Sequence, residues 1–249
     1  LKSYLGFFKP SMLIGVPYGV TAVEKRAIME AAKHAGAKSV NLIHEPLAAA
    51  IGSNLAIENP EGVMLVDIGG GTTEVAVMSL GGVCLCKSIR VAGDDFDDAI
   101  IQHFRRAYNL LIGERMAEVV KLKIGSASPL DEELSMAVCG RDLMCGLPKT
   151  FNVSSYEIRD ALTEGCSAIL GTLRLALEQT PPEISSDILK KGVFLTGGGA
   201  LLQGLSTYLS EELQLPVTLV KDPLGAVAVG TGCVLDQKKT VNQLSSISL

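Results

Sequence analysis

The chain has 249 residues, of which 47% are hydrophobic and 20% are charged, so it is long enough to form one or two hydrophobic cores. Its net charge of −5 and its dispersed basic residues argue against a nucleic-acid partner, which requires clustered Lys and Arg to displace counterions. No apolar run approaches the roughly 20 residues that a membrane-spanning helix needs.

The first elements of the chain alternate between short apolar strands and helices. Residues 12–16 are predicted to form a strand, and Thr21 and Glu24 have the spacing of a capping box at the start of the next helix. Residues 40–43 read as a second buried strand, and Pro46 is well placed in the first turn of another helix. We expect the first helix to bury one stripe, formed by Ala27, Ile28, Ala31, Ala32 and Ala35.

A glycine-hinged meander follows. Residues 63–67 form an apolar strand, the glycines at 69–71 reverse the chain into residues 73–79, and the glycines at 81–82 reverse it again into residues 83–91. This pattern predicts three neighbouring antiparallel strands.

The rest of the chain mixes helices and strands, which indicates α/β layers, and two similar sets of elements suggest two related domains. Ser154 and Glu157 form another capping box, and their helix is expected to run in two pieces as far as Glu178. The other expected elements are helices at 94–111, 114–124, 201–213 and 224–235, and strands at 134–138, 193–196 and 217–220.

The cysteines predict neither a metal site nor a redox site, because no two of them form a CxxC pair. Cys84 and Cys86 lie two apart in a strand-like run and are interpreted as small apolar residues on one face. Reduced thiols and the lack of a signal peptide indicate the cytosol. Because Leu1 is not a Met and a strand follows almost at once, we expect that an upstream segment is missing.

The segment that begins at Asp67 carries the clearest chemical signal. Asp67 ends an apolar strand, and Gly69, Gly70 and Gly71 can expose consecutive backbone N–H groups to a phosphate. An acid beside a phosphate suits a Mg²⁺ ion between the two. A hairpin with a flexible tip is the alternative, and the acid at the end of the strand favours the phosphate site.

A second glycine run lies at a strand-to-helix corner. Gly197, Gly198, Gly199 and Ala200 would let a ligand lie against the backbone near a helix N-terminus. Close packing of the strand and the helix is the alternative.

Glu45 would occupy the cap position of a helix, where Glu is a poor choice. A residue that breaks a local rule is a candidate for function, here the orientation of a water for attack on a phosphoryl group. A solvated loop acid is the alternative. Glu118 and Lys121 share one helical face, and alone they read as a surface ion pair.

At these places the sequence resembles the superfamily of actin, DnaK-type chaperones and sugar kinases. The run from Asp67 to Glu74 is similar to its second phosphate loop, the run from His44 to Gly52 to its connecting motif, and the run from Thr196 to Leu202 to its adenosine motif. Within the superfamily the sequence resembles the MreB family of bacterial actin-like proteins, as in Gly15-Val-Pro17, Thr72-Thr-Glu-Val-Ala-Val77 and Thr180-Pro-Pro-Glu183.

The resemblance implies an actin-like ATPase fold, with two related domains about a nucleotide cleft and the first domain incomplete. The expected domains are residues 1–62, with the helix at 224–236 packed back on them, a core of 63–92 and 164–223, and an inserted subdomain of 93–163. The implied site roles are Asp67 for Mg²⁺ through water, Gly69, Gly70, Gly71 and Thr72 for the β- and γ-phosphates of ATP, Glu45 for the hydrolytic water, Glu118 and Lys121 for the ribose and adenine, and Gly197, Gly198, Gly199 and Ala200 for the adenosine and α-phosphate.

The resemblance also implies a biological role. Slow ATP hydrolysis would time the polymerisation of the chain with copies of itself into cytoplasmic filaments. The filaments would lie on the inner face of the cell membrane and guide the cell-wall elongation machinery and rod shape. Phe7 and Phe8 are candidates for a membrane anchor, with core residues as the alternative.

One departure from the family is large. Its first phosphate loop, of the type Asp-Leu-Gly-Thr, and the small subdomain after it are not among these 249 residues. Impaired ATP binding and hydrolysis in a nucleotide-incompetent fragment is therefore the alternative. A chaperone would need a substrate domain after this region, and a sugar kinase would need a catalytic Asp other than Asp67.

Overall fold

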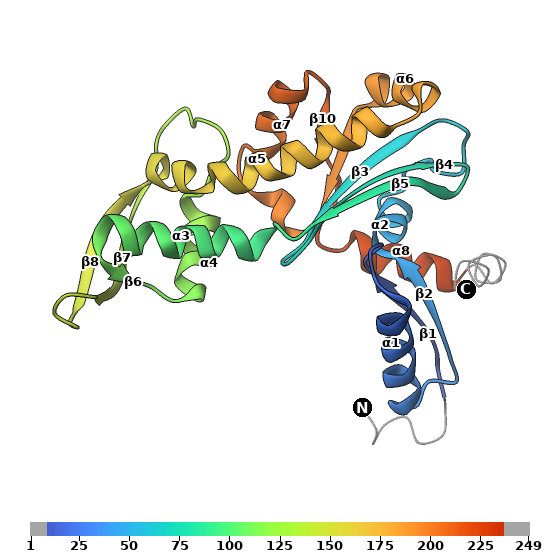
Figure 1. Cartoon of the computed structure of the whole chain (residues 1–249), viewed down its shortest axis with the longest axis horizontal. Coiled ribbons are helices and arrows are strands. Elements are labelled where there is room, and N and C mark those ends of the chain that lie inside the picture. Colours follow the sequence, from blue (N-terminus) through green and yellow to red (C-terminus); the bar gives the residue numbers. More distant parts are fainter. Residues whose placement is uncertain (1–8, 237–249) are drawn as a thin grey trace.

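A five-stranded sheet lies at the centre of the computed structural model, which describes residues 9–236 (Figure 1). Strand β3 (Val63–Ile68) runs parallel to β9 (Val193–Thr196) and antiparallel to β4 (Thr73–Ser79). The outer strands are β5 (Gly82–Ile89), which pairs with β4, and β10 (Val217–Leu219), which pairs with β9. The pairing of β3, β4 and β5 confirms the predicted meander.

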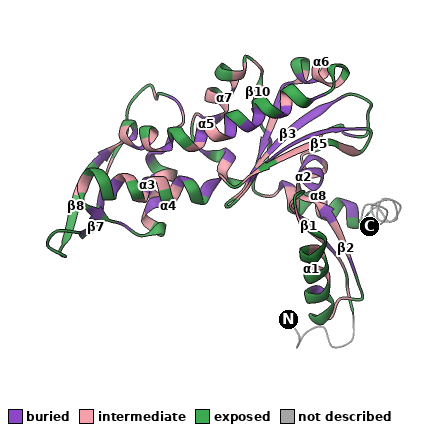
Figure 2. Cartoon of the chain, in the orientation of Figure 1, coloured by how far each residue is buried: buried purple, intermediate pink, exposed green. Residues whose placement is uncertain are grey.

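Both faces of this sheet are covered, so alternate side chains of its central strands enter two separate cores. Helix α5 (Ser155–Gln179) packs on β4 and β5, whereas α2 (Glu45–Gly52) packs on β3 and β4. Val75 belongs to the first core and Ala76 to the second. Figure 2 shows β3 buried over most of its length, and Asp67 is its one half-buried residue. Burial on both faces explains why these strands read as unbroken apolar runs.

Helix α8 (Ala226–Asp236) crosses α2 through a contact between glycines. A Cβ atom on Gly230 would lie 1.8 Å from the carbonyl oxygen of Ala48, and one on Gly52 would lie 1.9 Å from that of Ala226. The two backbones therefore approach more closely than any other residue type would allow. This contact brings the last described helix against an early segment of the chain.

A second group of elements extends from the sheet along the N-terminal half of α5 (Figure 1). Helices α3, α4 and α5 pack on one another beside a three-stranded antiparallel sheet. The division of the chain into domains stays a prediction. The elements of this group are α3 (Gly93–Tyr108), β6 (Leu110–Leu111), α4 (Glu114–Ile124), β7 (Ser135–Asp142) and β8 (Pro148–Ser154).

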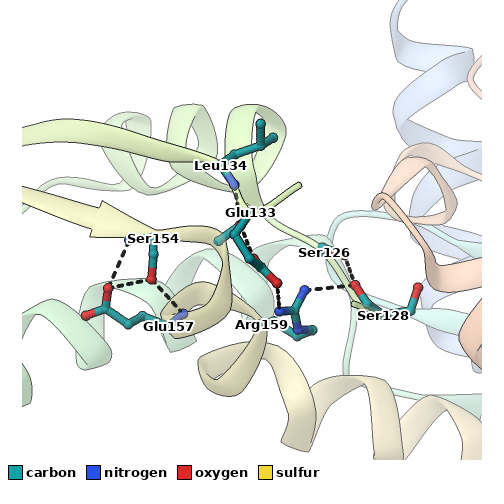
Figure 3. A network of polar contacts seen from close by, with 8 residues as sticks. Ser126, Ser128, Glu133, Leu134, Ser154, Glu157 and Arg159 are labelled. Carbon is teal, nitrogen blue, oxygen red and sulfur yellow. Dashed lines mark hydrogen bonds and ion pairs between the residues drawn. The ribbon is translucent and has the colours of Figure 1, made fainter. Parts of the chain in front are cut away.

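A polar network ties the segment between α4 and β7 to α5 (Figure 3). Arg159 donates from Nη1 to the carbonyl oxygen of Ser128 at 3.0 Å, and its guanidinium also pairs with the carboxylate of Glu133. Ser154 and Glu157 form the capping box at the start of α5, as predicted. The network holds this irregular segment against a regular helix.

The N-terminal elements form a separate arm (Figure 1). Strands β1 (Ser11–Val16) and β2 (Ser39–His44) are parallel, and α1 (Ala22–His34) begins at the predicted capping box of Thr21 and Glu24. The predicted buried stripe of α1 is wrong, because Ala32 is the one buried residue of the helix. Among the described elements, α1 packs mainly on β2, which covers little of its surface.

Three helix predictions need correction. Helix α5 is one helix rather than two pieces, and Gly165 within it leaves room for the ring of Phe96, whose Cε1 would lie 2.7 Å from an added Cβ. Residues 198–201 form a 3-10 turn before α7 (Leu205–Leu213), and α6 (Pro182–Lys191), which begins at a proline, was not predicted. Of the helices between residues 9 and 236, none is long and apolar enough to cross a membrane.

Candidate nucleotide site

The two glycine runs begin side by side, because the strands that precede them are paired. Asp67 near the end of β3 is the register partner of Thr196 at the end of β9. Gly197 has a φ of +84°, and a Cβ on it would lie 2.3 Å from the carbonyl oxygen of Ile68 and 2.5 Å from Oδ1 of Asp67. Only glycine fits there without a shift of the backbone. The carboxylate of Asp67 and both glycine turns therefore lie at one edge of the sheet.

The first turn leaves donors free for an anion. The N–H of Gly69 donates to the carbonyl oxygen of Thr72 at 2.9 Å, which closes the hairpin. The carbonyl oxygens of Gly69 and Gly70 accept hydrogen bonds from the first residues of α3 at 3.1 and 2.8 Å. Within residues 9–236, the N–H groups of Gly70 and Gly71 donate to no other backbone group, and both residues are exposed. This arrangement suits a phosphate.

Glu45 does not occupy the cap position that the sequence suggested. Helix α2 begins at Glu45, and His44 is the cap residue, although its side chain makes no capping hydrogen bond. An acid in the first turn of a helix is favoured by the helix dipole, so Glu45 breaks no local rule, and its predicted cap position is wrong. The unusual residue is His44, whose buried Nδ1 has no hydrogen-bond partner among the described residues.

The half-buried Glu45 nevertheless lies close to other acids. Burial raises the pKa of its carboxyl group. Burial and the charge of Glu45 raise the pKa of Asp67 to about 6, and burial is the main cause that raises the pKa of Glu74 to about 7. The three carboxyl groups therefore repel one another near the first glycine turn, and a cation there would relieve the repulsion.

Asp67 is the residue of this group that suits Mg²⁺. No hydrogen bond from another residue of the described chain ends on its carboxylate, which leaves both oxygens available. Mg²⁺ is usually held by one or two carboxylates together with waters and substrate phosphates. No three His, Cys, Asp or Glu residues of the described ranges are grouped so that they could hold a metal ion by themselves.

Glu118 and Lys121 do not pair with each other. Lys121 donates from Nζ to Oδ2 of Asp97 and to the carbonyl oxygen of Gly93, each at 2.8 Å. Glu118 lines a cavity of about 500 Å³ together with Asp94, whose Oδ1 would lie 3.3 Å from a Cβ on Gly70. The cavity therefore lies between Glu118 and Asp94, the residue beside the first glycine turn. Carboxylates suit the hydroxyl groups of a ribose, which donate hydrogen bonds.

The second glycine run lies near Lys121. Gly198, Gly199 and Ala200 lie in the 3-10 turn, and the first two line a small cavity of about 60 Å³ that Lys121 also lines. Asp94 and Asp97 were not predicted as site residues, although they belong to an acidic run at the start of α3 that is visible in the sequence. Phe7 and Phe8 lie outside the described residues.

Comparisons with known proteins agree on one family. A model of the family described as MreB/Mbl protein matches residues 2–243. The chain is 52% identical over 232 residues to the cell shape-determining protein MreB of Escherichia coli strain K12, which covers 92% of this chain and 67% of that protein. It is 48% identical over 230 residues to the cell shape-determining protein Mbl of Bacillus subtilis strain 168, with 92% and 69% covered.

Solved structures agree with these sequence matches. MreB5 of Spiroplasma citri bound to ADP has a TM-score of 0.93 and 39% identity, over 97% of this chain and 74% of that chain. The same protein bound to AMPPNP has a TM-score of 0.89 and 40% identity, over 93% and 69%.

Proposed function

The chain belongs to the MreB/Mbl family and has an actin-like fold, and we propose that it binds ATP with Mg²⁺, hydrolyses the ATP slowly and polymerises with copies of itself. In this proposal the filaments lie on the cytoplasmic face of the cell membrane and guide the cell-wall elongation machinery. The names of the Escherichia coli and Bacillus subtilis relatives, both cell shape-determining proteins, support this role.

The pairing of Asp67 with Thr196 is the observation that carries the nucleotide proposal. It brings an acid, a turn with free N–H groups and a second glycine turn to one edge of the sheet. The ADP and AMPPNP in the two Spiroplasma citri structures support a nucleotide as the ligand. In the proposed complex, Gly69, Gly70, Gly71 and Thr72 hold the β- and γ-phosphates.

The proposed contacts with the ribose and the base are placed at the two cavities that Glu118 and Lys121 line. Glu118 accepts hydrogen bonds from the ribose, and Lys121 lies between the base and the turn of Gly198, Gly199 and Ala200. Lys121 would have to leave Asp97 for the ligand, and because both side chains are only 15% exposed, contacts with the ligand must replace this ion pair. Asp67 would hold Mg²⁺ through water, and the ion would supply charge neutralisation for the phosphates.

Glu45 is the proposed residue for hydrolysis. As a carboxylate, Glu45 can accept a proton from a water molecule and orient that water toward the γ-phosphate. Burial raises the pKa of its carboxyl group, which makes the carboxylate a better base. Slow hydrolysis is expected, because a single positioned group contributes only about 10²–10⁴-fold.

Sedimentation tests the assembly part of the proposal. The protein is centrifuged with Mg-ATP, with Mg-ADP or without nucleotide, in the presence and absence of vesicles with anionic lipid. We expect Mg-ATP to increase the pelleted fraction and vesicles to carry more of it down. The Asp67→Ala variant should lose the effect of ATP, whereas the exposed Glu58→Ala variant should keep it. Equal pellets under all nucleotide conditions would support the nucleotide-incompetent alternative.

A further inference from the structure

Glu74 is a buried acid that the site described above does not use. It lies on β4 with an exposed fraction of 2%. Its Oε1 accepts a hydrogen bond of 2.8 Å from the N–H of Tyr18, a residue 56 positions earlier in the chain. Its Oε2 is buried and has no hydrogen-bond partner within residues 9–236. The contact joins the N-terminal arm to the central sheet.

The contact leads to Glu45 in two further steps. The ring of Tyr18 packs on the ring of His44, with 4.8 Å between the centroids. His44 is the cap residue of α2, and Glu45 follows it directly. A displacement of the Tyr18 loop (residues 17–20) would therefore move the start of α2. Glu74 is also the register partner of Asp67, so one strand pair fixes both Asp67 and the anchor of that loop.

Stability does not explain an acid at this position. Two acids directly opposite on neighbouring strands destabilise a sheet, and a buried oxygen without a partner costs free energy. A residue that is costly for the fold and connected to the site is a candidate for a functional role.

We propose that Glu74 is a positioning residue for hydrolysis: it anchors the Tyr18 loop and, through Tyr18 and His44, sets the position of Glu45 relative to Asp67. The inference rests on the proposed ATP hydrolysis. It predicts that Glu74 affects the rate at which bound ATP is hydrolysed more than it affects the affinity for ATP.

Two measurements test the proposal on the same variants. Hydrogen exchange reports the N–H of Tyr18, and steady-state ATP hydrolysis gives kcat and KM. In Glu74→Ala we expect at least about tenfold faster exchange at Tyr18 and a kcat lower by roughly 10–100-fold, with KM changed less than about threefold, because small displacements of a positioned group cost up to about 10²-fold. Glu74→Gln keeps an acceptor and should restore slow exchange and most of kcat.

Asp187→Ala is the matched control. Oδ2 of Asp187 accepts a hydrogen bond of 2.9 Å from the N–H of Gly62, a carboxylate-to-backbone contact of the same kind away from the proposed site. This variant should leave kcat and the exchange at Tyr18 unchanged. Tyr18→Ala provides a second test if Glu74→Ala fails to fold, because the side chain of Tyr18 is 40% exposed. It should lower kcat while the melting temperature stays close to that of the unmodified protein.

Three results would overturn the proposal. These are unchanged exchange at Tyr18 in Glu74→Ala, an unchanged kcat in Tyr18→Ala, and a loss of kcat in Glu74→Gln as large as that in Glu74→Ala. Each of them leaves ATP hydrolysis by the unmodified protein in place. Absence of hydrolysis in the unmodified protein would instead overturn the proposed function, and this inference with it.

Discussion

Glu74 and Asp67 are register partners on β4 and β3, so two carboxyl groups lie opposite each other on adjacent antiparallel strands. Burial, together with the charge of Glu45, raises the pKa of Asp67 to about 6. Burial is also the main cause that raises the pKa of Glu74 to about 7, with the charges of Glu45 and Asp67 adding to it. The folded protein therefore retains protons that the unfolded chain loses.

This difference makes stability depend on pH. A carboxyl group whose pKa is raised by folding stabilises fully below its unfolded pKa of about 4, and that contribution is lost as pH rises through its folded pKa. For Asp67 the loss falls between about pH 4 and pH 6, and for Glu74 it continues to about pH 7. Asp67→Asn removes one of the two groups.

We therefore predict that Asp67→Asn raises the free energy of unfolding at pH 8 by about 1–3 kcal/mol and changes it much less at pH 4. Urea unfolding of both proteins at the two pH values, without divalent cations, measures the difference. Contributions from groups that do not interact with Asp67 cancel in the comparison. A variant that is less stable than the unmodified protein at pH 8 would show that Asp67 makes a favourable contact as an anion.

The crossing of α2 and α8 gives a prediction about packing. A Cβ on Gly230 would lie 1.8 Å from the carbonyl oxygen of Ala48, so Gly230→Ala should force the helices apart and cost about 1–3 kcal/mol. Gly232 lies on the same helix with nothing within 4 Å of an added Cβ, so Gly232→Ala should be neutral or slightly stabilising. Thermal unfolding of the two variants checks the pair, and equal melting temperatures would contradict the close contact.

The order of the elements could be predicted from the sequence because local signals were strong. Thr21 with Glu24 and Ser154 with Glu157 marked two helix starts, and the glycines before Thr73 and Val83 marked the meander. The errors came from tertiary packing. Whether the alanines of α1 are buried depends on distant elements, and α5 passes through Gly165 unbroken because a ring packs against it.

The site was predictable in its parts but not in its connections. The glycine turns and Asp67 were visible as local patterns, whereas the pairing of Asp67 with Thr196 joins residues 129 positions apart. Lys121 was expected at the nucleotide, but its bond to Asp97 depends on how α3 packs against α4. Glu74 could be read only as part of a motif, because Tyr18, its partner, belongs to another strand–loop unit.

Substitution of two arginines on α5 tests how much the network of Figure 3 contributes to stability. The side chain of Arg159 is 14% exposed and bonds to Ser128 and Glu133, whereas Arg174 pairs with Glu212 at the surface and is 51% exposed. Arg159→Met should lower the free energy of unfolding by about 1–3 kcal/mol because it removes the charge-assisted hydrogen bonds of a largely buried guanidinium. Arg174→Met should change it by less than about 1 kcal/mol. Similar losses in both variants, measured by urea unfolding, would contradict the role given to burial.

Glu45 is the residue on which hydrolysis depends most in the proposed function. Glu45→Ala should leave ATP binding nearly intact and slow hydrolysis by roughly 10²–10⁴-fold. Phosphate release under single-turnover conditions measures the chemical step, and Glu58→Ala serves as a control for the loss of an exposed acid. Hydrolysis at the unmodified rate in Glu45→Ala would exclude Glu45 as the residue that positions water.

Calorimetric titration of Mg-ATP into the unmodified protein and into Gly197→Ala tests most directly whether the two glycine turns form a nucleotide site. Because an added Cβ would lie 2.3 Å from the carbonyl oxygen of Ile68 and 2.5 Å from Oδ1 of Asp67, this change disturbs the edge where the two glycine turns meet. We predict one-to-one binding to the unmodified protein and binding at least about tenfold weaker to the variant, since the displacement of one charge-assisted hydrogen bond costs about 1.5–3 kcal/mol. No binding to the unmodified protein, or equal binding to both, would contradict it.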